Sequence, residues 1–96
     1  MSQPASSPPR LNVKVPDDRV AGHYADFAGV WHTSETFVLD FLALSQPMRP
    51  DPENAGQTVA DAELVSRVRV PAAQVWEIMK ALEKQYSAWE AEQGRR

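Results

Sequence analysis

The sequence predicts an α+β fold, in which a small antiparallel β-sheet of three to four strands, built around a central hairpin, carries one C-terminal amphipathic helix. Three observations predict it. First, two apolar, strand-like runs, residues 20–33 and 36–44, are joined by a polar connection. Second, the side chains of residues 64–70 alternate between two faces. Third, apolar side chains recur at steps of three and four residues over 72–93. With 96 residues in all, the chain is one domain at most.

The N-terminal part divides into a tail and a first strand. Residues 1–10 hold three prolines and three serines and no large apolar side chain except the initial methionine, which predicts a disordered tail. The single α+β domain then covers residues 11–94. Residues 11–15 alternate cleanly and stop at Pro16, so we expect an edge strand there. The hairpin over 20–33 and 36–44 follows.

The second half of the chain returns to the sheet and then turns helical. Residues 45–62 are rich in proline and polar residues, which predicts a long, mobile loop. Residues 64–70 should form a further strand, with Leu64 on the same face as Ser66, Val68 and Val70. Pro71 suits the first position of a helix, and no residue from 72 to 93 interrupts the helical pattern. One stripe of that helix is apolar: Val75, Ile78, Met79, Leu82, Tyr86 and Trp89.

Both faces of the predicted hairpin are apolar, and this observation predicts a dimer. Residues 36–44 place Phe37, Leu39 and Phe41 on one face, yet the other face is apolar too. One helix covers only one face, so we expect a second copy of the chain to cover the other. Trp76 lies off the apolar stripe of the helix, and aromatic residues in such positions are enriched at protein interfaces. The expected interface residues are Val38, Asp40, Leu42, Leu44, Tyr24 and Trp76.

Asp40 is the one charged residue among residues 36–44, whose other side chains are apolar except for Thr36. A buried carboxylate needs hydrogen-bond or ion-pair partners. The interpretation we favour is structural: Asp40 accepts hydrogen bonds from His32, Arg67, Arg69 or a tryptophan Nε1 and thereby fixes strand register or dimer geometry. The alternative is an acid or base that shares a site with Asp26 across the dimer. A carboxylate pair in so small a chain is weak evidence for catalysis.

No other pattern predicts a reactive or ligand-binding site. The chain has no cysteine and only two histidines, without ligand spacing, so we expect no metal, cofactor or catalytic residue. Lys14, Arg67 and Arg69 could form a small basic strand face that contacts nucleic acid, but the net charge is −3 and we do not expect such binding. Without an apolar leader or a membrane-spanning stretch, the expected location is the cytoplasm.

The order of motifs resembles a family of small prokaryotic domains, domain of unknown function 3467. The resemblance rests on "HYADFAGVWHTSETFVLDF", a proline-containing gap, and "RVRVPAAQVWEIMKALEKQYSAWEAEQG". The matching positions are Tyr24, Ala25, Phe37, Leu39, Asp40, Phe41, Pro47, Val70, Pro71, Leu82, Glu90 and Gly94. Departures from the family's pattern occur at Asp26, Thr36, Val70 and Trp89. The resemblance implies one α+β unit and supplies no catalytic residues.

The function that these observations favour is a non-enzymatic, homodimeric interaction or regulatory module. Its further partner would be another protein, bound through residues 45–62 or through a strand edge. Two alternatives stay open: a nucleic-acid-associated regulator that uses the basic face, and a small enzyme with its carboxylate pair at the dimer interface.

Overall fold

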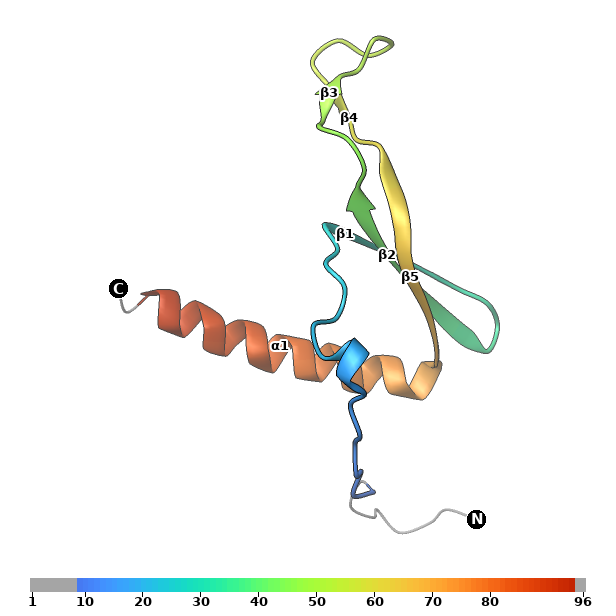
Figure 1. The fold of residues 1–96 in the computed structure, drawn as a ribbon, viewed down its shortest axis with the longest axis vertical. Coiled ribbons are helices and arrows are strands. Elements are labelled where there is room, and N and C mark those ends of the chain that lie inside the picture. Colours follow the sequence, from blue (N-terminus) through green and yellow to red (C-terminus); the bar gives the residue numbers. More distant parts are fainter. Residues whose placement is uncertain (1–8, 95–96) are drawn as a thin grey trace.

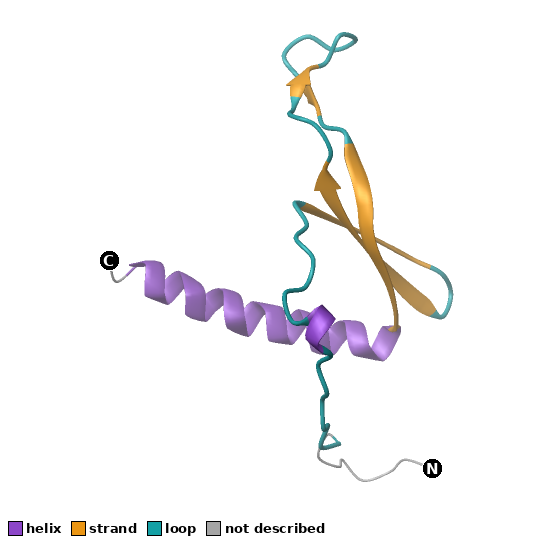
Figure 2. Ribbon diagram, in the orientation of Figure 1, coloured by secondary structure: helices purple, strands orange, loops and turns teal. Residues whose placement is uncertain are grey.

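The computed structural model of the chain describes residues 9–94, and it has a three-stranded antiparallel sheet followed by one long helix (Figures 1 and 2). The predicted fold class is confirmed. The sheet order is β1-β2-β5, so the 36–44 strand is central. The elements are η1 (Asp17–Arg19), β1 (Phe27–His32), β2 (Thr36–Leu44), β3 (Arg49–Pro50), β4 (Thr58–Val59), β5 (Ala62–Pro71) and α1 (Ala72–Gly94).

A tight polar turn closes the β1–β2 hairpin. The Thr33 amide donates to the Thr36 carbonyl at 2.8 Å, and the two threonine hydroxyls lie 2.9 Å apart. Hydroxyl side chains that bond the local backbone favour turns, which is why the chain reverses here. The resulting register places Val38 between Trp31 of β1 and Arg69 of β5.

A β-bulge in β5 changes which side chains share a face. Phe41 pairs with Ser66, but Leu42 pairs with Leu64, so Val65 is the extra residue. Because opposed residues of antiparallel strands point to the same face, Leu64 shares the face of Leu42 rather than that of Ser66. The prediction that Leu64 lies with Ser66, Val68 and Val70 is therefore wrong, since strict alternation does not survive a bulge.

The N-terminal segment forms no strand among its described residues. The edge strand predicted at 11–15 is absent, and of the strand predicted at 20–33 only Phe27–His32 is regular. Instead the chain makes η1 and then bends at Gly22, whose φ of 71° suits glycine. His23 and Ala25 then lie beside Phe41, Ser66 and Val68, over one face of the sheet. Of the predicted tail 1–10, residues 1–8 lie outside the described part.

The proline-rich stretch 45–62 contains a short hairpin, β3–β4, which projects beyond the main sheet (Figure 1). Arg49 forms an ion pair with Asp61 at the base of the hairpin. At the tip, the Asp51 carboxylate accepts bonds from the Glu53 amide at 2.9 Å and from Asn54 Nδ2 at 3.0 Å. Stretch 45–62 is therefore structured locally, and the mobility predicted for it stays a prediction.

The helix α1 packs on the sheet only through its first turns and then extends away from it (Figure 2). On α1, Val75 and Ile78 are half-buried and every other described side chain is exposed. Within residues 9–94, Val38 is the one hydrophobic side chain that is fully buried, at 1% exposure. The core of a single copy is thus very small for a chain of this length.

Candidate functional site

Asp40 lies at the centre of a polar cluster formed by Trp31, Asp40 and Arg67, one residue from each strand. Arg67 donates to the carboxylate through Nε at 2.6 Å and through a terminal nitrogen at 2.9 Å, a bidentate arrangement. Trp31 Nε1 donates to Oδ2 at 3.1 Å, and the guanidinium carbon lies 5.5 Å from the centre of the Trp31 ring. Bidentate Arg–carboxylate pairs have strict geometry, so the cluster ties all three strands together.

The electrostatics of the polar cluster agree with a structural role. The hydrogen bonds from Arg67 lower the pKa of Asp40 below its ordinary value, against an opposing effect of desolvation, and Trp31 adds to the lowering. The same contact raises the pKa of Arg67. Asp40 is thus an ionised, fully partnered carboxylate. The prediction that arginine and a tryptophan Nε1 supply its hydrogen bonds is confirmed, and His32 instead stacks on Phe37 at 5.3 Å.

Asp26 has a different partner and does not join Asp40 within the chain. Its carboxylate accepts the backbone amide of Leu44 at 2.7 Å, and its own amide donates to the Leu42 carbonyl at 2.8 Å. These two bonds extend the hairpin by one more pair beyond Phe27. Asp26 therefore anchors the start of β1, and a site that Asp26 and Asp40 share across two copies stays an untested alternative.

The three residues predicted to contact nucleic acid do not form one strand face. Arg67 and Arg69 share a face, as expected, because they lie opposite Asp40 and Val38. The Arg67 charge is already matched by Asp40, and Lys14 belongs to a segment outside the sheet. Among the described residues, Arg69 is the one member of the three that lies on the sheet without an ion pair to an acidic side chain, so the geometry gives this alternative little support.

The predicted interface residues have unequal access to a partner. The Val38 side chain is enclosed within one copy, between its cross-strand neighbours, and cannot contact a second chain. Asp40, Leu42 and Leu44 are half-buried. Tyr24 and Trp76 are exposed, at 78% and 59%. The face that carries Asp40 is therefore partly closed by its own side chains.

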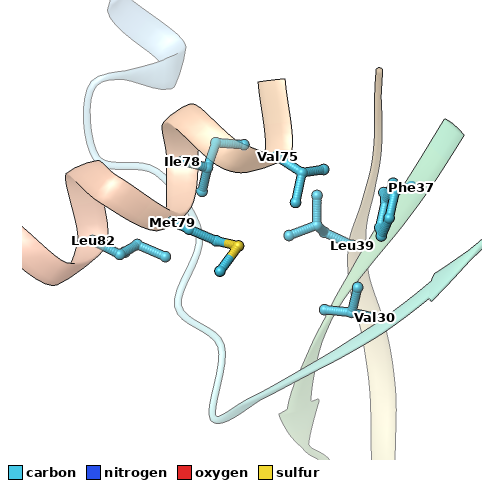
Figure 3. Close-up of a pocket in the computed structure, with 7 residues that line it drawn as sticks. All are labelled: Val30, Phe37, Leu39, Val75, Ile78, Met79 and Leu82. Atoms are coloured by element: carbon cyan, nitrogen blue, oxygen red, sulfur yellow. The ribbon is translucent and has the colours of Figure 1, made fainter. Parts of the chain in front are cut away.

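The opposite face of the sheet holds an apolar groove that sequence reasoning did not identify as a site. We call it the helix-side groove, and its volume is about 350 Å³. It lies where α1 leaves the sheet, and no polar side chain lines it (Figure 3). Its residues are Val30, Phe37, Leu39, Val75, Ile78, Met79 and Leu82. The apolar stripe of the helix was the available signal, but it indicated a closed contact with the sheet rather than an open groove.

Among residues 9–94 there is no cluster of three or more histidine or acidic side chains that could hold a metal ion. No helix in the described part has the length and apolar character needed to cross a bilayer. Within residues 9–94, the helix-side groove and the exposed apolar residues that continue from it along α1 form an apolar surface that one copy does not cover; these residues are Met79, Leu82, Tyr86 and Trp89.

Comparison with known proteins places the chain in a family. No curated protein and no solved structure matches it. One family does, described as Protein of unknown function (DUF3467), and the match covers residues 1–95. The resemblance noted from the motifs around Asp40 and Pro71 is therefore confirmed. This chain belongs to the DUF3467 family of proteins of unknown function.

Proposed function

We propose that this protein is a non-enzymatic, homodimeric interaction module in which a second copy completes the hydrophobic core. One observation carries the proposal: a single copy encloses one hydrophobic side chain, Val38, while sixteen large hydrophobic residues in the described part are exposed. Exposed apolar surface on that scale is typical of an interaction surface rather than of a stable monomer.

Surface area and dimensions support the same proposal. The chain exposes 9021 Å², whereas a compact monomer of 10.7 kDa exposes about 5,500 Å² by the usual scaling of surface with mass. The radius of gyration is 18.5 Å, against about 12.5 Å for a compact domain of this length. The excess of roughly 3,500 Å² per copy is large enough for an obligate homodimer interface, which buries about 2,000–5,000 Å² in total.

The dimer would present the β3–β4 hairpin to a further protein. This hairpin projects from the sheet at the end away from α1, so a partner copy on the helix would leave it free (Figure 1). Its polar and charged side chains are held by local bonds, notably Arg49 to Asp61 and Asn54 to Asp51. Two copies would display two such hairpins, which increases avidity for a repeated or dimeric target.

The test is the mass in solution, measured by light scattering across a wide concentration series. We expect twice the chain mass of 10.7 kDa, and a thermal midpoint that rises with protein concentration because dissociation is linked to unfolding. A protein that stays at the mass of one chain, with a midpoint independent of concentration, would overturn the proposal.

A further inference from the structure

We propose that the two copies associate through an antiparallel pair of α1 helices whose two-fold axis passes at Leu82, so that each copy places Tyr86 and Trp89 in the helix-side groove of the other. The inference rests on the proposed function and adds its geometry. It makes each groove incomplete without residues from the second chain.

The exposed half of the stripe lacks any cover within one copy. Met79, Leu82, Tyr86 and Trp89 are each more than half exposed, at 53%, 65%, 59% and 52%. Tyr86 and Trp89 already pack on each other, with ring centroids 5.6 Å apart. Two aromatic side chains held together in water form the kind of preorganised anchor that fills a pocket on a partner.

The helix-side groove has the chemistry that this aromatic pair requires. Its lining is apolar on both sides, with Val30 and Leu39 from the sheet opposite Met79 and Leu82 from the helix (Figure 3). Leu82 lies at one end of the groove, where the exposed stripe continues along α1 (Figure 3). A second helix running antiparallel along this stripe would therefore carry its C-terminal half directly into the groove.

The spacing of the stripe selects an antiparallel, two-fold arrangement. Val75 and Ile78 precede Leu82 by seven and four residues, and Tyr86 and Trp89 follow it by four and seven. In a two-fold pair centred on Leu82, Ile78 meets the partner's Tyr86 and Val75 meets the partner's Trp89. The same patch on both copies is thus self-complementary, as an isologous interface demands.

The charged residues of α1 fit this arrangement. At about 100° per residue, Val75, Ile78, Tyr86 and Trp89 lie within about 40° of Leu82 around the helix. The nearest charges are Glu90 and Glu92, each about 80° away, and Glu83, about 100° away. Lys80 and Lys84 would face each other across the axis, but they lie about 160° from Leu82 and so point outward from the contact.

Two other ways of pairing two copies cover less of the exposed apolar surface. A parallel helix pair would stack Tyr86 on the partner's Tyr86 and leave both grooves empty. Pairing of two β1 edges would extend the sheet but leave the exposed stripe in water. The antiparallel pair is the arrangement that covers the stripe and fills the groove together.

Cysteine cross-linking tests the geometry directly, because the chain has no cysteine of its own. Helix axes about 8–10 Å apart bring Cα atoms on the two-fold axis within the span of a disulfide, about 4.4–6.8 Å. We expect Leu82→Cys to form a covalent dimer rapidly on mild oxidation. Lys84→Cys, on the outer side of the same helix, is the matched control and should remain largely uncross-linked.

A mixing experiment checks the register. Val75→Cys and Trp89→Cys chains, distinguished by an affinity tag on one, should cross-link to each other after mixing and much less to themselves. Circular dichroism of each reduced variant confirms that the fold is kept, as expected for Leu82 and Trp89 because both are exposed.

The outcomes separate this inference from the proposed function. A wild-type dimer whose Leu82→Cys variant cross-links no faster than Lys84→Cys would overturn the helix geometry and leave the dimer standing. Self-cross-linking of Trp89→Cys at the rate of Leu82→Cys would also overturn it, in favour of a parallel pair. A wild-type monomer would overturn both proposals.

Discussion

Replacing Val38 by alanine should destabilise the fold far more than any other valine-to-alanine change in the sheet, since Val38 is enclosed at 1% exposure. Alanine lacks two of the methyl groups of valine, and each buried carbon contributes about 0.8 kcal/mol, so the transfer term is about 1.6 kcal/mol. A hole of roughly 50 Å³ would add up to about 1.2 kcal/mol at ~24 cal/mol per Å³. Trp31 and Arg69 flank the site and can relax into part of the hole, so we expect about 2 kcal/mol in total.

The assay is urea unfolding followed by circular dichroism, at one fixed protein concentration. With an m-value of about 1.5 kcal/mol/M, the midpoint should fall by roughly 1.3 M while m stays constant. Val68→Ala is the matched control: it lies in the same sheet but is 42% exposed, and it should shift the midpoint much less. Equal shifts for the two variants would refute the conclusion that Val38 is the centre of the core.

Two further predictions concern charge and backbone. The pKa of Asp40 is lowered by Arg67, so the ion pair stabilises the fold above the ordinary pKa of 3.8, and this stability is lost as the pH falls below that value. Over the acid range, the urea midpoint of the wild type should therefore drop more than that of Asp40→Asn. Parallel pH profiles for the two proteins would contradict this prediction. Gly56 has a φ of 84°, so Gly56→Ala should lower the free energy of unfolding by about 1 kcal/mol and speed amide exchange in the β3–β4 hairpin. Gly29→Ala is the control: the new Cβ has open space there, and neither effect is expected.

Much of the fold followed from local patterns. The hairpin, the returning strand and the helix after Pro71 were predictable because alternation and helical periodicity persist over six or more residues. The need of Asp40 for partners was predictable as well, since a carboxylate in an apolar strand must be hydrogen-bonded. The register then brought Arg67 and Trp31 to it, a pairing that residue types suggest but only strand alignment decides.

Other features depend on tertiary structure that alternation does not encode. Residues 11–15 have the pattern of a strand, yet a strand also needs a free edge within reach, and the bend at Gly22 leads the chain over the sheet instead. The bulge at Val65 moved Leu64 to the other face. The helix-side groove was missed because a stripe does not show how far along α1 the sheet extends.

In the dimer that we propose, the second copy could bind to either of the two sheet faces. Sequence alone favoured the face of Asp40, because it is apolar and α1 covers the other one. In the structure, Arg67 and Trp31 bond to Asp40 across that face and Val38 is enclosed beside them, so a partner there would have to cover a charged cluster. The helix side offers the reverse: an apolar groove next to an uncovered apolar stripe. Desolvating ionised groups opposes association while covering apolar surface favours it, which is why we propose the helix side as the interface. A charge at half-buried Leu42 would therefore disrupt contacts within one copy, whereas a charge at exposed Leu82 would leave those contacts intact and weaken the pairing of two copies.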